Sequence, residues 1–162
     1  MSFCLVSGGF AQLQSVEVGI DGLTCSLCAR GVEKSIQKLS FIEEVKMDLA
    51  GTKMNVRFLD REKVDVHLIA KSVEDAGFSV RYLTATLLGK ELLPLASKGF
   101  LYENDLYHMI GPDQLLPPGS FSVRFIGKAY QSKKEFKKWK TSLEDAMAEV
   151  SPLYSHIYFI TL

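Results

Sequence analysis

The sequence of 162 residues predicts an α+β fold built from two parts. Apolar residues alternate as in strands from residue 15 onward, and two segments before residue 84 carry apolar residues at helical spacing. Beyond residue 84, glycine and proline divide the chain into short pieces, which excludes long helices there until about residue 132. We therefore expect one unit over residues 15–84 and a second unit over residues 85–162.

The first unit has a regular order of elements. Apolar alternation predicts strands near residues 16–20, 45–49, 54–58 and 78–84. Helical spacing predicts helices over residues 28–39 and 66–76, and Asp65 and Gly77 are suited to cap and to end the second helix. The order β-α-β-β-α-β predicts a ferredoxin-like sandwich, in which both helices cover one face of a four-stranded antiparallel sheet.

The second unit is expected to be a small antiparallel β-rich unit with one helix. Its pattern predicts a hairpin over residues 99–110, a strand over residues 120–130 and a closing strand over residues 154–162. Ser132 and Glu135 form a capping box before an apolar stripe that ends near Val150, which predicts the helix. A partly open barrel of the oligonucleotide/oligosaccharide-binding (OB) type fits this order of elements. The sequence pattern does not indicate what function this unit has.

Residues 1–14 form an apolar segment rich in small residues. They fit the end of a truncated signal peptide without its basic region, or alternatively an apolar N-terminal extension. The first interpretation predicts a periplasmic or secreted protein, and the second a cytoplasmic one. No other window approaches the roughly 18 apolar residues that a membrane span needs.

Cys25 and Cys28 lie where the first strand gives way to the first helix, so both sulfurs should project from one tight turn. Thiolates are soft ligands, and a pair of them favours Cu(I), Hg(II), Ag(I) or Cd(II) over hard cations. Structural Zn(II) usually takes four ligands, so zinc would require a second molecule. We expect the helix N-terminus to lower the pKa of Cys28, with Arg30 and Lys34 adding positive charge nearby.

The residues around this pair resemble a known family. Gly22-Leu23-Thr24-Cys25-Ser26-Leu27-Cys28, then Val32-Glu33-Lys34, then Glu74-Asp75-Ala76-Gly77-Phe78 are similar in order and spacing to the heavy-metal-associated domain. The resemblance covers residues 15–84. It implies a β-α-β-β-α-β module that binds copper or a related soft metal transiently and exchanges it with a metal-donor or metal-acceptor protein.

The same resemblance implies the site residues. Cys25 and Cys28 become the metal ligands, and the loop is supported by Leu23, Thr24, Ser26, Leu27, Arg30 and Phe78. Leu23 stands where the family usually has methionine, a swap that conserves volume. Phe78 stands where many soluble chaperones of the family have lysine and the ATPase modules have an aromatic residue.

Two other functions fit parts of the sequence. The cysteine pair could serve thiol–disulfide exchange, although the thioredoxin-type sequence around it is missing. Alternatively, the second unit could make the protein a non-catalytic adaptor that recognises a partner.

Other classes of function are not expected. Nineteen basic residues offset nineteen acidic ones, so nucleic acid is not an expected partner. No enzyme signature occurs. His67 is expected on the solvated face of its helix, and His108 and His156 are expected to pack in strands, with a secondary soft-metal site as the alternative. The protein is expected as a monomer or a metal-bridged dimer.

Overall fold

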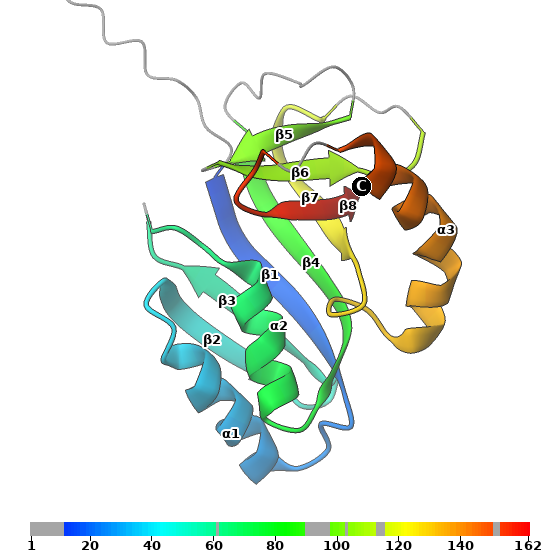
Figure 1. Cartoon of the computed structure of the whole chain (residues 1–162). Coiled ribbons are helices and arrows are strands. Elements are labelled where there is room, and N and C mark those ends of the chain that lie inside the picture. The colour runs from blue at the N-terminus through cyan, green and yellow to red at the C-terminus, as the bar shows by residue number, and fades with distance from the viewer. Residues whose placement is uncertain (1–11, 61, 90–97, 103, 113–115, 151–152) are drawn as a thin grey trace, which may run out of the picture.

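A computed structural model describes residues 12–60, 62–89, 98–102, 104–112, 116–150 and 153–162 (Figure 1). In chain order, the elements are β1 (Gln12–Asp21), α1 (Ser26–Gln37), β2 (Ile42–Asp48), β3 (Lys53–Phe58), α2 (Val66–Asp75), β4 (Ser79–Gly89), β5 (Gly99–Tyr102), β6 (Asp105–Met109), β7 (Gly119–Ile126), α3 (Lys133–Glu149) and β8 (Ile157–Thr161). The strands form one eight-stranded sheet in the order β2-β3-β1-β4-β7-β8-β6-β5. Most of the predicted N-terminal segment 1–14 lies outside the described residues, but its residues 12–14 begin β1.

The first half of the sheet has the predicted ferredoxin-like arrangement. β2, β3, β1 and β4 are antiparallel neighbours, and α1 and α2 cover one face of them (Figure 1). The alternating residues Val16, Val18 and Ile20 of β1 are buried against Val32 and Ile36 of α1 and the apolar face of α2. The α+β prediction for this half is therefore confirmed.

Local signals fixed the ends of α2 as expected. The Asp65 carboxylate accepts a hydrogen bond of 2.9 Å from the backbone N–H of His67, which satisfies one of the unpaired donors of the first turn. Gly77 ends the helix with a φ of +87°, a left-handed conformation that glycine adopts without a steric penalty.

The second half continues the same sheet. β4 extends to Gly89, and its residues 84–89 pair with β7, so the predicted boundary after residue 84 falls inside this strand. The predicted hairpin is formed by β5 and β6, and the closing strand is β8. β8 is antiparallel to β7 but parallel to β6, so the expectation of a purely antiparallel unit is wrong, and the OB type is not confirmed. Alternation within one strand carries no information about the direction of its neighbour, which explains the error.

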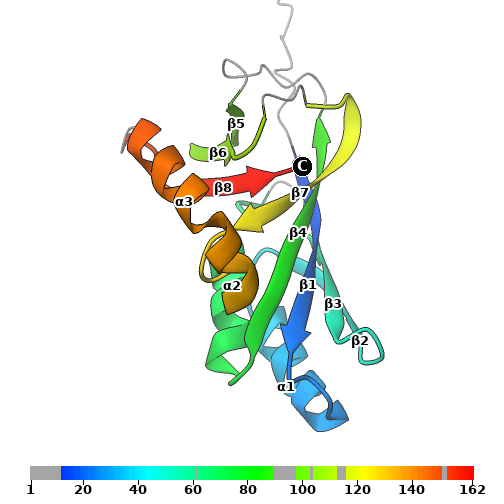
Figure 2. The ribbon, with the colours of Figure 1, turned by 90° about the vertical axis from the view of Figure 1, so that its right-hand side faces the viewer.

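The capping box at the start of α3 is present, because the backbone N–H of Glu135 donates to Ser132 Oγ at 3.3 Å. The apolar stripe of this helix is only partly covered. Ala146 is buried with Ile110 and Ile126, Trp139 is half-buried, and Met147 is 59% exposed. Figure 2 shows α2 and α3 on the same side of the sheet.

Aromatic side chains join the two halves into one core. Tyr107 stacks on Phe100 with ring centroids 4.8 Å apart, and it also contacts Tyr158 and Phe125. The Tyr158 hydroxyl donates to the Asp65 carboxylate at the start of α2, at 3.4 Å. Tyr102, Tyr107 and Tyr158 of the second half are therefore buried, and one core cluster includes residues of both halves.

Candidate metal centre

The two thiols lie at the junction of β1 and α1. Gly22 turns the chain with a φ of +83°, and the N–H of Thr24 donates to the carbonyl oxygen of Gly22 at 3.0 Å. Cys25 is the N-cap residue of α1, with extended backbone angles, and Cys28 lies in the first turn of the helix. Both cysteines are free thiols; Cys25 is exposed and Cys28 is half-buried. The loop thus presents two adjacent sulfurs to a molecule that approaches from solvent.

The position of Cys25 at the cap lowers the pKa of its thiol. The main cause is the backbone N–H of Cys28, followed by the Cys28 thiol and the backbone N–H of Leu27, which all stabilise the Cys25 thiolate. An N-cap side chain is placed to meet the N–H groups two and three residues further on. Cys25 is therefore the sulfur that ionises first.

The pKa of Cys28 is raised rather than lowered, which corrects the expectation from the sequence. The largest cause is the side-chain hydrogen bond with Cys25, followed by burial and by the negative charge of the Cys25 thiolate, which all favour the protonated Cys28 thiol. The backbone N–H of Cys28 favours both thiolates, but for Cys28 this effect is outweighed by the causes that raise its pKa. The two groups therefore titrate as a pair that loses its first proton from Cys25.

The structure places the predicted supporting residues in different environments. Leu23 is completely buried below the loop, and Phe78 is half-buried, with its ring 3.8 Å from the position that a Cβ atom on Gly22 would take. Thr24, Ser26 and Arg30 are exposed, and Leu27 is 75% exposed. Leu23 and Phe78 are thus brought against the loop from inside, and the role of the whole set in holding a metal remains a prediction.

The contacts recorded for the three histidines do not involve the Cys25–Cys28 loop. His67 has an edge-to-face contact with Tyr130, and burial lowers the pKa of His108. His156 Nδ1 lies 3.1 Å from the buried Asp105 carboxylate. Among the described residues, no group of three or more His, Cys, Asp or Glu side chains could hold a metal ion. The donor set of this part of the chain is the two thiols, which fits an ion that accepts two soft ligands.

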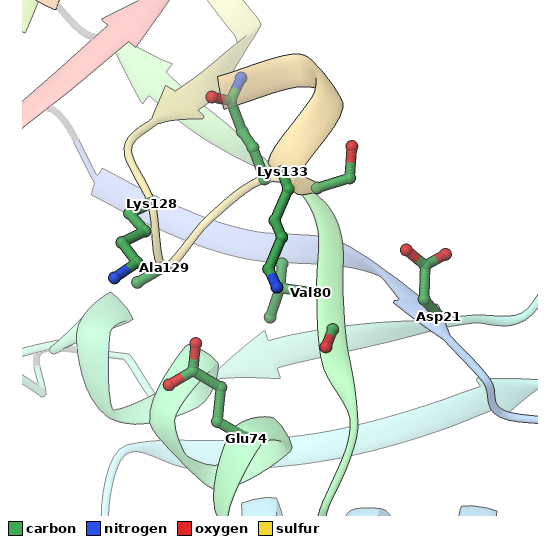
Figure 3. Close-up of a pocket in the computed structure, with 9 residues that line it drawn as sticks. Asp21, Glu74, Val80, Lys128, Ala129 and Lys133 are labelled. Carbon is green, nitrogen blue, oxygen red and sulfur yellow. The ribbon is translucent and has the colours of Figure 1, made fainter. Parts of the chain in front are cut away.

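An open cleft of about 620 Å³ is lined by residues from both halves of the chain, and the sequence did not predict it (Figure 3). Asp21 and Ser79, which lie beside Gly22 and Phe78 in the chain, line one side, and Glu74 of α2 contributes a carboxylate. Lys128 and Lys133 enter from the second half. Residues so far apart in sequence are brought together only by the pairing of β4 with β7, so no local pattern could have found this cleft.

Exchange of Cys28 for alanine is expected to raise the pH at which Cys25 becomes reactive. The variant removes the thiol donor, so the pKa of Cys25 should rise toward its ordinary value. At a pH below this raised pKa, less Cys25 is ionised, and alkylation by iodoacetamide should therefore be slower than in the wild-type protein. The backbone N–H donors remain, so the shift should be partial. Alkylation rates measured against pH test this, with Ser26→Ala as a control that should keep the native profile. An unchanged profile in Cys28→Ala would contradict the assignment.

Within the described residues, no helix combines the length and the apolar character needed to cross a lipid bilayer.

Comparison with known proteins finds relatives for the first half of the chain. The profile of the heavy-metal-associated domain family matches residues 17–79. The copper chaperone CopZ of Bacillus subtilis is 36% identical over 61 residues, which are 38% of this chain and 87% of CopZ. Copper-transporting ATPase 1 of Rhizobium meliloti is 39% identical over 70 residues, 43% of this chain. The chain spans only 8% of the length of that ATPase. A solved structure of a CopZ metallochaperone is 23% identical, with a TM-score of 0.38, over 41% of this chain and 97% of the other.

Proposed function

Because the chain belongs to the heavy-metal-associated domain family, we propose that its Cys25–Cys28 loop binds one soft metal ion and passes it on. Cu(I) is the ion that we favour. The observation that carries this proposal is the pair of free thiols at the N-terminus of α1, one exposed and one half-buried. The relatives named for copper transport support the choice of metal.

The two thiols have unequal roles in this function. Cys25 is exposed and ionises first, so it is suited to be the first ligand for an incoming ion. Binding of the ion then favours loss of the proton that Cys28 retains, because metal ligation requires the thiolate. Release follows the reverse order, as a thiolate of the partner displaces one sulfur and then the other. The bonds that change are the metal–sulfur bonds and the S–H bonds of the thiols, whose protons pass to solvent, and we propose a carrier rather than an enzyme.

The donor set also limits the alternatives to Cu(I). Hg(II), Ag(I) and Cd(II) share its preference for thiolates. Zn(II) usually requires four ligands, and two thiols supply half of that number. A zinc ion would therefore be expected to bridge two chains. The partner in transfer is proposed to be a metal donor or acceptor with its own thiolates, such as a metal transporter.

A competition experiment tests the proposal. Reduced protein is titrated with Cu(I) in the presence of a competing chelator, and we expect about one tightly held ion per chain, since two thiolates complete the linear coordination of one Cu(I). Metal analysis of protein purified under reducing conditions identifies the ion bound in the cell. A reduced protein that holds no Cu(I) but reduces insulin disulfides would favour thiol–disulfide exchange instead, which the lowered pKa of Cys25 also suits.

A further inference from the structure

Arg81, near the start of β4, contacts one turn and the end of one strand in the metal-binding half. Its Nη1 donates to Thr52 Oγ1 at 2.8 Å, and its Nη2 donates to the carbonyl oxygens of Gly51 and Thr52 at 3.2 and 3.3 Å. Nη1 also lies 3.5 Å from Asp21 Oδ1. The guanidinium group therefore joins the turn between β2 and β3 to the last residue of β1.

A β-bulge aims this side chain. Gly19 of β1 pairs with Tyr82, and Ile20 pairs with Val80, so Arg81 is the extra residue of β4 with no partner on β1. A bulge of this kind redirects the side chain of the bulged strand. The bulge thus directs the Arg81 guanidinium toward the end of β1 and the turn between β2 and β3.

The groups that Arg81 contacts are connected to the cysteine loop through β1. The carbonyl oxygen of Thr52 also accepts a hydrogen bond of 2.9 Å from the N–H of Ile20, so the turn is fastened to β1 itself. Asp21 is followed by Gly22, where the loop that carries Cys25 begins. Any displacement of the β1 end would therefore move the base of the metal loop.

The second half of the chain attaches to the same residue. The backbone N–H of Ser132, the N-cap of α3, donates to the carbonyl oxygen of Arg81 at 3.1 Å, and Gln131 forms a β-bridge with Tyr82. Arg81 is thus held by its backbone from the second half and holds the metal-binding half through its side chain.

We propose that Arg81 is a positioning residue that fixes the base of the metal loop and connects it to the C-terminal half. This inference rests on the proposed function, because it takes the Cys25–Cys28 loop as the metal site. Hydrogen bonds from a guanidinium group are stronger than those between neutral groups, so the three contacts with Gly51 and Thr52 provide the anchor. The exposed pair with Asp21 contributes less and serves mainly to orient the end of β1.

The first test compares substitutions of Arg81 in the full chain. Arg81→Ala is expected to weaken Cu(I) binding about tenfold, the lower end of the effects seen when residues behind a metal ligand are removed. Arg81→Lys should restore part of the affinity, because a lysine keeps the charge but lacks the fork that reaches both the β2–β3 turn and Asp21. Arg57→Ala is the matched control: Arg57, on β3, pairs with Glu43 and Glu44 of β2, and its loss should leave Cu(I) affinity unchanged.

The second test needs no metal. The equilibrium between the Cys25–Cys28 dithiol and its disulfide is measured in a glutathione redox buffer, and Arg81→Ala is expected to shift it about threefold or more toward the dithiol, because a looser loop lowers the effective concentration of one thiol at the other. If the wild-type protein holds no Cu(I) but this shift occurs, the positioning role stands and the proposed function fails.

Folded Arg81→Ala protein with native Cu(I) affinity and a native redox equilibrium would overturn the inference. If Arg81→Ala does not fold, then Arg81→Lys and Asp21→Asn decide the question. Both keep part of the contact network, and both are expected to show the same changes at smaller size. Native behaviour of both variants would equally overturn the inference.

Discussion

Replacing either Cys25 or Cys28 with serine is expected to abolish tight binding of Cu(I). Each thiolate supplies half of a two-donor set, and a serine hydroxyl is a hard donor that does not ionise at neutral pH, so one remaining thiolate cannot hold the ion against a competing chelator. Competition with a chromophoric Cu(I) chelator measures the loss. Both variants should stay folded, because Cys25 is exposed and Cys28 is only half-buried.

Cys4→Ser is the matched control for this experiment, since it removes the third cysteine of the chain and leaves the pair in place. It should bind Cu(I) like the wild-type protein. Retention of native affinity in the Cys25→Ser/Cys28→Ser double variant would eliminate the proposed metal centre. Loss of affinity in Cys4→Ser alone would mean that the donor set extends beyond the loop.

The first half of the fold could be predicted from the sequence because its signals are local. Alternation in β1 and β3 and the caps at Asp65 and Gly77 are each contained within a few residues, and the structure reproduces them. The strand predicted over residues 45–49 is β2, but it spans Ile42–Asp48 and leaves Leu49 exposed. The order of these elements then leaves the ferredoxin-like arrangement as the simplest way to bury both helix faces on one sheet.

Two features of β4 could not be predicted from the local sequence pattern. The predicted strand follows the alternation of Val80 and Tyr82, but the bulge at Arg81 shifts the buried positions to Leu83, Ala85 and Leu87. A bulge depends on the partner strand and leaves no mark in the alternation before it. The continuation to Gly89 depends on β7, which lies thirty positions further along the chain and could be matched to β4 only in three dimensions.

The Cys25–Cys28 loop could be predicted as a metal site from sequence because only two residues separate its cysteines, but the pKa shifts of the two thiols depend on the backbone conformation. The sequence places both sulfurs at the start of a helix, and only the extended angles of Cys25 identify it as the cap. The expected lowering of the Cys28 pKa was therefore wrong: the pKa of Cys28 is raised, and the pKa of Cys25 is lowered. Arg81 and the neighbouring cleft were missed because their contacts join distant parts of the chain.

Replacing Phe125 with alanine is expected to cost about 3–5 kcal/mol of unfolding free energy, the usual range for a phenylalanine removed from a core. Phe125 is completely buried, and its ring lies 5.5 Å from Tyr130, 5.5 Å from Tyr158 and 6.1 Å from Tyr107, measured between centroids. Chemical denaturation followed by circular dichroism measures the loss. Phe159→Ala is the matched control, because Phe159 is only half-buried in the smaller cluster under α3, and its loss should be smaller.

The shape of the unfolding curve of Phe125→Ala shows whether the two halves of the chain unfold together. Tyr130 and Tyr158 contact His67 and Asp65 of the metal-binding half, so damage at Phe125 is transmitted to α2 through the shared core. We therefore expect a single cooperative transition, and native Cu(I) affinity in the fraction of Phe125→Ala protein that remains folded. Two separate transitions, with the midpoint of the metal-binding half unchanged, would show that the halves unfold independently and that the aromatic contacts contribute nothing to α2.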